Sequence, residues 1–472
     1  MVLHMPPLGR DRDRAAGVPR RPAQPLPPAP TPRERPLGTI GLLWALRTNP
    51  LLTWTRAHYR EPILSGRSVL GDLVIVSEPS AIRHVLVDNA ANYRKDDLQL
   101  RLLGPGLGGG LLTAEGDVWR AQRRALAPLF TPRLTERFRP AMQASAEWLA
   151  ERLRRQRDGR RIDMAGEFSR ATLDVLERTI FPQGLGGEPT KFIEAVTRYF
   201  DTAGRIEPFD ILGLPDWAPR FGRNRAAPAL AFFGEAVEAM IETARRNAAS
   251  GADADAPDLM SLLLAAADPE TGRGLGHAEV RANILTFIGA GHETTANALT
   301  WATYLLATHP EWRERAEAEV DAVGALDPER LPVVRAIVDE ALRLYPPAAS
   351  LSREAIGPDR VADLRIRPGA RVVISPWLLH RHERLWRDPG AFDPGRFLPG
   401  RREEIDRFAY LPFGAGPRIC IGAGFALQEA VIILAAMLRE FRFDPAPGHV
   451  VEPIQRVTLR PKNGMPMILR KR

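Results

Sequence analysis

The chain contains a single cysteine, Cys420, and the residues around it suit a metal ligand. They read Phe413-Gly-Ala-Gly-Pro-Arg-Ile-Cys-Ile-Gly422. Glycine has no Cβ, so Gly414, Gly416 and Gly422 would let the backbone approach a flat ligand closely. A thiolate is an axial ligand that haem iron takes in proteins. The segment therefore predicts a haem site with sulfur on one face of the macrocycle.

The segment that follows the cysteine, Gly422-Ala-Gly-Phe-Ala-Leu-Gln-Glu-Ala430, is predicted to be helical. The positive end of that helix would lie near the sulfur and stabilise its negative charge. A lone cysteine is more often a small buried hydrophobic residue, and a cysteine nucleophile paired with histidine is a further alternative. The glycine-rich surroundings and the lack of a recognisable histidine partner favour a ligand.

A long helix is predicted over Arg281–Thr308, with two glycines, Gly289 and Gly291, in its interior. Each costs about 1 kcal/mol relative to alanine, so the helix should gain something from them. Helical spacing places small residues and one hydroxyl on a common face. That face comprises Phe287, Gly291, Thr294 and Ala298, with Ala290 beside them. We expect a notch there that admits a small molecule such as dioxygen.

Two of these segments carry a resemblance to the cytochrome P-450 family. The cysteine segment resembles the family's ligand signature at Phe413, Gly416, Arg418, Cys420 and Gly422. The helix segment Ala290-Gly-His-Glu-Thr-Thr295 resembles the family's oxygen-activation motif. The other motifs follow in the family's order from roughly residue 39 to the C-terminus.

The resemblance implies roles for these residues. Cys420 would be the axial thiolate ligand of haem b, Phe413 would pack near the sulfur, and Arg418 would pair with a haem propionate. Gly414 and Gly422 would belong to the cofactor site. Thr294 would hydrogen-bond dioxygen and Glu293 would help to relay protons to it, whereas His292 lies off the proposed face and is interpreted as structural.

The resemblance also assigns charged residues elsewhere in the chain. Glu340, Arg343 and Arg396 resemble the family's buried acid-arginine-arginine triad, which is structural. Trp119, Arg123 and Arg353 resemble positions that bind haem propionates, a task that suits the forked arginine side chain. Without this context, each stretch would be interpreted as an ordinary helix surface.

The predicted fold class is mainly α with small β-sheets (α+β). Strands are predicted at Asp72–Ser77 and Arg371–Ile374, and the end of the chain, Val450–Leu469, is rich in strand formers. The resemblance implies the cytochrome P-450 fold, a triangular helical prism that encloses the haem. We expect residues 1–36, which alternate proline and arginine, to be a disordered tail, and residues 37–472 to be a single catalytic domain.

Composition limits the possible partners and locations. The formal net charge is +8, but basic residues are scattered among acidic ones and form no aromatic-laced cluster, which argues against nucleic-acid binding. The apolar stretch Thr39–Trp54 is interrupted well short of a membrane-spanning length, so no transmembrane anchor is expected. One cysteine fits a reducing compartment, and we expect a cytoplasmic monomer.

The resulting hypothesis is a monooxygenase that hydroxylates or epoxidises a hydrophobic molecule such as a fatty acid, terpenoid or steroid. NAD(P)H electrons would arrive indirectly, through a ferredoxin or flavodoxin and its reductase. An acidic partner of this kind would dock on the cysteine side, through Arg120 and Arg124. The substrate pocket is predicted to comprise Phe287, Ala290, Gly291, Ala348, Ala349 and Leu351.

Two alternatives remain beside the cysteine nucleophile. A haem-binding sensor without enzymatic activity would need the cysteine loop but neither Glu293 nor Thr294. The spaced glycines at 104–109 match a dinucleotide-binding pattern, yet the charged residues before them do not form a buried strand. We interpret that match as false, and the resemblance implies a mobile loop above the haem instead.

Overall fold

A computed structural model describes residues 25–68, 71–180, 195, 221–250, 258–324 and 326–472. Helices make up most of this part of the chain. They are α1 (Thr39–Thr48), α2 (Pro79–Arg83), α3 (Asp97–Leu107), α4 (Gly116–Leu126), α5 (Pro132–Arg137), α6 (Arg139–Arg154), α7 (Met164–Ile180), α10 (Phe221–Ser250), α11 (Leu259–Ala265), α12 (His277–Thr308), α13 (Pro310–Val323), α14 (Pro332–Leu344), α15 (Pro376–Leu379) and α16 (Ala423–Glu440).

In the described ranges the strands are short and form four small sheets. They are β1 (Ile63–Ser68), β2 (Gly71–Val76), β3 (Tyr93–Arg94), β4 (Arg161–Asp163), β5 (Leu351–Ala355), β6 (Asp359–Val361), β7 (Leu364–Ile366), β8 (Arg371–Ile374), β9 (Phe441–Pro445), β10 (Pro453–Gln455), β11 (Leu459–Pro461) and β12 (Pro466–Lys471). The largest sheet has the order β1-β2-β8-β5-β3, and β2 and β8 pair in parallel with Leu73 opposite Arg371. Another has the order β4-β12-β9. The predicted class, mainly α with small sheets, is confirmed.

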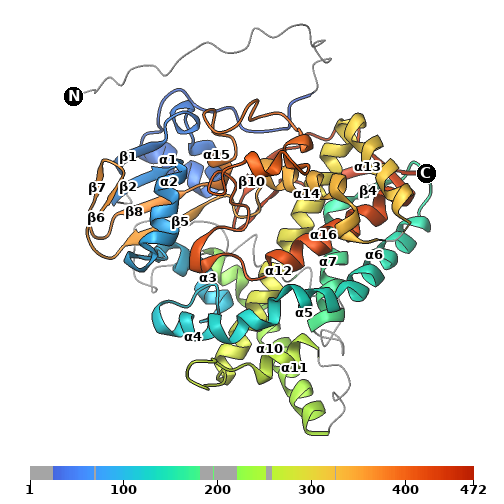
Figure 1. The fold of residues 1–472 in the computed structure, drawn as a ribbon, viewed down its shortest axis with the longest axis horizontal. Helices are drawn as coiled ribbons and strands as arrows, with labels where there is room; N and C mark the ends of the chain where they lie inside the picture. The colour runs from blue at the N-terminus through green and yellow to red at the C-terminus, as the bar shows by residue number, and fades with distance from the viewer. Residues whose placement is uncertain (1–24, 69–70, 181–194, 196–220, 251–257, 325) are drawn as a thin grey trace.

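Helix α12 is the central element of the helical part (Figure 1). It packs against α7, α16, α14 and α10, and most of its side chains are buried. Near its C-terminal end the fully buried Trp301 stacks on Tyr345 with ring centroids 3.8 Å apart and planes 9° from parallel. Because α12 is enclosed on several sides, its own residues line the interior rather than the molecular surface.

The large sheet lies to one side of the helices, on the left in Figure 1. The β-branched residues of its inner strands are buried in succession, and Val74 and Val372 pack against α2 and neighbouring turns. β5 leads from the end of α14 into this sheet, and it pairs antiparallel with β8. The sheet thus holds the segment after α14 beside the loop that carries Cys420, since Leu351 of β5 lies against Gly414.

The N-terminal segment differs partly from the prediction of a tail disordered to residue 36. Residues 1–24 lie outside the described residues, but residues 25–36 bind to the body of the protein. The Tyr345 hydroxyl donates to the carbonyl of Pro28, 2.9 Å away, and the Arg33 amide donates to the carbonyl of Trp54. Arg33 also accepts from the Arg56 amide and forms an isolated β-bridge with Thr55, so this segment is held by backbone contacts with the chain that follows α1. Every helix in the described ranges is too short or too polar to cross a bilayer.

Candidate active site

The loop before α16 holds Cys420 in a closed backbone turn. The Cys420 amide donates to the carbonyl of Phe413, 2.9 Å away, and the Ile419 amide donates to the carbonyl of Gly416. Gly414 and Gly416 both have φ of +72°, in the left-handed region that favours glycine. A Cβ at Gly416 would overlap the carbonyl of Leu86, so this loop can pack on its neighbour only with glycine there.

The sulfur of Cys420 lies at the start of α16, as predicted from the sequence. It accepts a hydrogen bond from the backbone amide of Gly422, and Gly422 is the N-cap residue of that helix. Desolvation by the surrounding protein raises the pKa of the Cys420 thiol, while that hydrogen bond and the charge of Arg123 lower it. The residue is nevertheless exposed, so its sulfur is accessible to a ligand, and a coordinated metal ion would stabilise the thiolate form.

On α12 the exposed face differs in one respect from the predicted notch. Ala290 is exposed and Thr294 half-buried in a mostly enclosed part of the helix, and the Thr294 hydroxyl donates to the Ala290 carbonyl at 2.7 Å. Gly291 does not open onto this face. A Cβ there would lie 3.2 Å from Leu176, so the glycine serves the close approach of α7 to α12. The helix-propensity cost of Gly291 is therefore offset by the packing of α7 on α12. The open face consists of Ala290 and Thr294.

Glu293 is a buried carboxylate next to that face. Its residue is 9% exposed, and burial raises its pKa to about 7, against the opposing effect of a hydrogen bond from Thr458. One oxygen lies 3.5 Å from the guanidinium of Arg460 on β11, and the other has no hydrogen-bond partner in the described chain. A carboxyl with this pKa can hold or release a proton near neutral pH. Sequence reasoning missed Arg460, because nothing local connects β11 with α12.

His292 is structural, as expected. It is 3% exposed, and its Nδ1 lies 3.0 Å from the Ile288 carbonyl. The carbonyl of His292 accepts from the Thr172 hydroxyl on α7. Burial lowers the pKa of His292, so the ring stays neutral and joins the two helices.

The predicted propionate-binding residues form a cluster of positive charge. The Arg418 guanidinium lies over the Trp119 ring, 4.1 Å from its centroid, and pairs with Glu115 at 2.8 Å. Desolvation, together with the charge of Arg418, lowers the pKa of Arg353 to about 10. Arg123 interacts electrostatically with Cys420. The structure therefore brings Trp119, Arg123, Arg353 and Arg418 to the side of the site that contains the cysteine.

This cluster fits a cofactor that carries carboxylates. Arg353 is half-buried, and no carboxylate lies within ion-pair distance of it among the described residues. A buried cation without a counter-charge is costly, so an anionic group is expected to complete such a site. Paired carboxylates are the groups that arginine forks bind best. The residues present thus suit haem, with its propionates on this cluster and its iron on Cys420.

The predicted structural triad is closed by protein contacts. Arg343 and Glu340, both 0% exposed in their side chains, form two hydrogen bonds of 2.6 and 2.7 Å. Arg343 also donates to three carbonyls of the segment 380–391. Arg396 lies 3.6 Å from Glu340, and the Asp393 amide donates to the same carboxylate. The triad joins α14 to the segment that precedes the cysteine loop.

Two residues predicted to line the substrate pocket belong to the core instead. Phe287 is 8% exposed and packs edge-on against Phe130, with centroids 5.3 Å apart. Ala349 is 2% exposed, and its carbonyl accepts from the Ser375 hydroxyl. Sequence periodicity cannot separate a core face from a pocket face, because both are apolar. Ala348 is exposed and Leu351 half-buried, so both remain candidates for the pocket beside Ala290.

The predicted docking arginines are already paired. Arg124 binds both oxygens of the buried Asp268 at 2.7 Å and lies 3.1 Å from Glu270. Arg120 pairs with Asp117 on the same helix. Each has an acidic partner within the chain, so neither is an unpaired charge for an acidic partner.

The glycine pattern at 104–109 is not a dinucleotide turn. Gly104 and Pro105 lie inside α3, and a short strand, β3, precedes that helix. The following glycines approach α12 closely, because a Cβ at Gly110 would lie 2.6 Å from the Ala282 carbonyl. Asn283 accepts from the Leu111 amide. The segment is a helix and a turn bound to α12, and not the loop that the resemblance implied.

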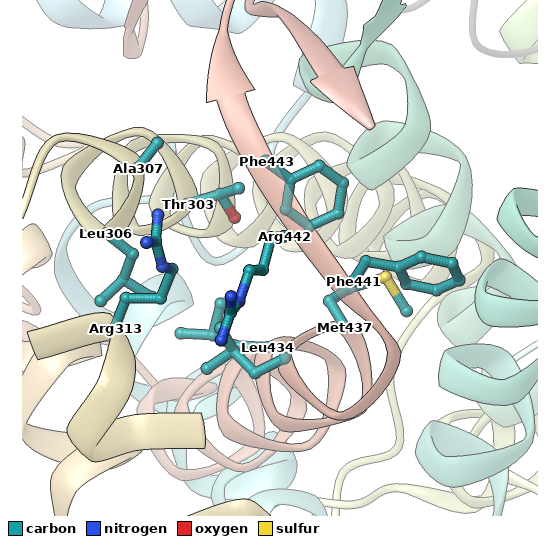
Figure 2. Close-up of a pocket in the computed structure, with 10 residues that line it drawn as sticks. Thr303, Leu306, Ala307, Arg313, Leu434, Met437, Phe441, Arg442 and Phe443 are labelled. Atoms are coloured by element: carbon teal, nitrogen blue, oxygen red, sulfur yellow. The ribbon is translucent and has the colours of Figure 1, made fainter. Parts of the chain in front are cut away.

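A small cavity lies away from these residues, between α12, α16 and β9 (Figure 2). Its volume is about 10 Å³, enough for roughly one water molecule. Thr303 and Arg313 line it, and the Thr303 hydroxyl and Arg313 Nε have no hydrogen-bond partner among the described residues. This cavity suits a structural water and not a substrate.

Comparison with known proteins decides which family has this arrangement. A family model described as cytochrome P-450 matches residues 30–467. The chain belongs to the cytochrome P-450 family. This cytochrome P-450 is 33% identical to cyclooctatin synthase of Streptomyces melanosporofaciens over 439 residues, which are 91% of this chain and 92% of that protein. It is 31% identical to pentalenene oxygenase of Streptomyces avermitilis over 442 residues, which are 89% and 92%.

A solved structure extends the likeness to the whole fold. The crystal structure of a cytochrome P-450, CYP102L1, has a TM-score of 0.79 and 29% sequence identity, and the match covers 96% of this chain and 100% of that one. The sequence resemblance is thereby confirmed, and this cytochrome P-450 is a monooxygenase. Membership of the family implies a haem with a thiolate ligand, a redox partner and a hydrophobic substrate.

Proposed function

We propose that this cytochrome P-450 hydroxylates or epoxidises a terpenoid-like hydrocarbon, with Cys420 as the axial ligand of haem b. The observation that carries the proposal is the geometry of the cysteine loop. Gly416 permits a turn that no other residue allows, and this turn holds the sulfur at the N-terminus of α16. The sulfur also lies beside a cluster of cations that suits propionates. Each part would be unusual in a protein without a planar anionic cofactor.

The bound haem would supply the activation of dioxygen, and residues of α12 would control protons and water. Thr294 can shift its hydroxyl from the Ala290 carbonyl to a ligand over the haem, since the two share an accessible face. Glu293 can take a proton from solvent and pass it inward, because its pKa is about 7. Arg460 would hold that carboxylate in place. This acid-alcohol pair favours an enzyme over a haem sensor.

The ligand assignment is tested by the spectrum of the reduced carbon monoxide complex. We expect absorption at the position typical of thiolate ligation. In the variant Cys420→His, absorption should move to the position typical of imidazole ligation, because the macrocycle stays and only the donor atom changes. A wild-type spectrum of the imidazole type, or a thiolate spectrum that survives in Cys420→Ala, would show that another residue binds the iron.

The substrate class rests on the open apolar face and on the relatives. Ala290, Ala348 and Leu351 are the predicted pocket residues that remain outside the core. One relative is named an oxygenase of pentalenene, and terpenoid oxidation recurs among the similar proteins. A spectral titration of the ferric protein against terpenoids, fatty acids and steroids ranks the candidates. Binding of fatty acids alone would refute the terpenoid assignment.

For electrons we propose an acidic ferredoxin or flavodoxin, which would transfer them from NAD(P)H through its reductase. The net charge of +8 supports such a partner, although Arg120 and Arg124 do not. Attraction of this kind weakens as salt screens it. Turnover at limiting partner concentration should therefore fall as ionic strength rises, and turnover that does not respond to salt would exclude this partner. A cytoplasmic location and a monomeric state complete the proposal.

A further inference from the structure

A pair of buried side-chain amides joins α4 to α12. Asn283, on α12, and Gln122, on α4, are both 0% exposed. The Asn283 amide nitrogen donates to the Gln122 side-chain oxygen, 3.1 Å away, and to the backbone carbonyl of Glu279 at 2.8 Å. A buried amide is costly unless its donors and acceptor have partners, so the remaining polar atoms of the pair also need them.

Those remaining atoms bind the segment 108–114, which connects α3 to α4. The Asn283 side-chain oxygen accepts from the Leu111 amide at 2.8 Å, and the Gln122 amide nitrogen donates to the Gly109 carbonyl at 2.9 Å. The backbone of the segment is thus held from two sides, by α12 through Asn283 and by α4 through Gln122.

Between these two hydrogen bonds Gly110 lies directly on α12. A Cβ there would lie 2.6 Å from the Ala282 carbonyl and 2.7 Å from the Thr286 hydroxyl oxygen, so only glycine fits. Residues four apart share a helix face, and the row that contains these two residues continues through Ala290 to Thr294. Ala290 is exposed, so the open face of α12 begins where the contact with the segment ends.

The far end of the segment is bound from the side of the cysteine loop. Arg418, in that loop, donates to the Ala114 carbonyl at 3.1 Å, and Lys95, which follows β3, donates to the Leu112 carbonyl. The Leu112 side chain is half-buried against the apolar cluster that contains Phe287. The segment therefore forms a wall from the cysteine loop to the edge of the open face.

Hydrogen bonds within the segment close this wall into a turn. The Gly110 carbonyl accepts from the amides of Thr113 and Ala114 at 2.9 and 2.7 Å. Buried polar networks whose members are satisfied make the surrounding structure rigid. Lifting the segment off α12 would take these partners from Asn283 and Gln122, and a buried polar group that loses its partner is destabilising.

We propose that Asn283 is a positioning residue which, with Gln122, fixes the segment 108–114 as a rigid wall and so limits the size of molecule that reaches the open face. The inference rests on the proposed function, which makes that face the place where the substrate is oxidised. A rigid wall sets one pocket width, whereas a mobile segment adapts to molecules of different size. The amide pair therefore determines which members of the substrate class the pocket accepts.

The first measurement is hydrogen–deuterium exchange of the holoenzyme, read by mass spectrometry. We expect peptides from the segment 108–114 to exchange slowly in wild type. Asn283→Leu keeps the side-chain size but removes the acceptor of the Leu111 amide, so exchange there should become about tenfold faster. Exchange in the β4-β12-β9 sheet should stay at the wild-type rate, which shows that the fold is intact.

The second measurement is the association of two azoles with the ferric holoenzyme, imidazole and the larger 4-phenylimidazole, followed by stopped-flow absorption. Asn283→Leu should bind 4-phenylimidazole about tenfold faster than wild type, by the same loss of a hydrogen bond, and imidazole at nearly the wild-type rate. The ratio of the two rate constants reports the width of the opening, and a general loss of stability would not change it.

Asn92→Leu is the matched control. The Asn92 side chain likewise binds a backbone amide and a carbonyl of a distant segment, both of Gly357, at 2.8 and 3.3 Å. Because it holds the chain after β5, its loss should change neither the azole ratio nor exchange in the segment 108–114. If Asn283→Leu fails to fold, Gln122→Met, which releases the segment from the side of α4, should show the same change in the azole ratio and decides in its place.

The outcomes separate this inference from the proposed function. Fast exchange of the segment in wild type, or exchange that is unchanged in Asn283→Leu, would overturn the rigid wall. Equal acceleration of both azoles, or of neither, would show that the wall does not select by size. A wild type that binds no haem would instead refute the proposed function, while exchange of the protein as purified would still test the hold of Asn283 on the segment.

Discussion

The triad behind the cysteine loop allows a quantitative test of how burial changes the stability that an ion pair contributes, because α14 carries both a buried and a partly exposed pair. Arg343 and Arg335 both lie on α14 and both pair with an acid on the same helix, Arg343 with Glu340 and Arg335 with Asp339. The Arg343 side chain is 0% exposed, whereas that of Arg335 is 40% exposed. The same substitution, Arg→Gln, therefore removes a fully buried charge in one case and a hydrated one in the other.

Arg343→Gln should cost about 3–5 kcal/mol of unfolding free energy, because it leaves Glu340 buried without its close partner. It also releases three carbonyl acceptors of the segment 380–391. Arg335→Gln should cost under about 1 kcal/mol, since the pair is partly hydrated and Asp339 keeps the Tyr410 hydroxyl as a donor. For a chain of this length the melting entropy is on the order of 1 kcal/mol per kelvin, so the midpoints should fall by roughly 3–5 K and by at most about 1 K.

The assay is thermal unfolding of both holoproteins by far-ultraviolet circular dichroism at a single scan rate. The haem absorption, followed in parallel, shows whether cofactor loss precedes unfolding. Equal midpoint shifts for the two variants would refute the reasoning, because they would mean that burial does not set the cost of the broken pair. A larger midpoint shift for Arg335→Gln than for Arg343→Gln would show that the exposed pair contributes more to stability than the buried one.

Three further predictions concern the site itself. Thr294→Ala should keep haem but uncouple electron consumption from product formation, measured as product per NAD(P)H, and unchanged coupling would remove Thr294 from the mechanism. Burial raises the pKa of Glu293 to about 7, so folded protein holds a proton that unfolded protein releases, and stability should fall as pH rises from about 4.5 to 7. The stability of Glu293→Gln relative to wild type, measured in thermal melts, should therefore increase from pH 5 to pH 8. A stability difference that is the same at pH 5 and at pH 8 would contradict a buried carboxyl at position 293. Gly416→Ala should lose haem on purification, because its Cβ would overlap the Leu86 carbonyl at a position where φ is +72°. Gly400→Ala is the control, since Gly400 has φ +88° but open space around it. That variant should lose only about 1–2 kcal/mol of stability to backbone strain and should retain haem.

The parts of the fold that sequence predicted were those with a local pattern. The helix over 281–308 was expected from apolar spacing, and α12 spans His277–Thr308. β8 was predicted with its observed bounds, because Arg371–Ile374 combines β-branched residues with flanking turns. The cysteine loop is also local, since its glycines and its hydrogen bond from Cys420 to Phe413 lie within ten residues.

The errors came from contacts between distant segments. Gly291 was assigned to the open face, but Leu176 lies against it, and no spacing within α12 reveals which side α7 covers. Arg124 was interpreted as a docking charge, although Asp268, far along the chain, binds it. Arg460 and Lys95 were missed for the same reason. Their importance depends on which charges surround them after folding.

The charged side chains of the interior differ in whether the protein itself neutralises them. Glu340 and Arg343 satisfy each other and the carbonyls around them, so this pair needs nothing from outside and serves the scaffold. Lys95 is buried and Arg353 half-buried, each without a carboxylate within ion-pair distance among the described residues. Glu293 has one oxygen without a hydrogen-bond partner in the described chain. Leaving such groups incomplete costs folding free energy, and that cost is offset only when a ligand or a proton completes them. In an arginine-rich chain, incomplete neutralisation is therefore a better guide to the functional charges than charge itself.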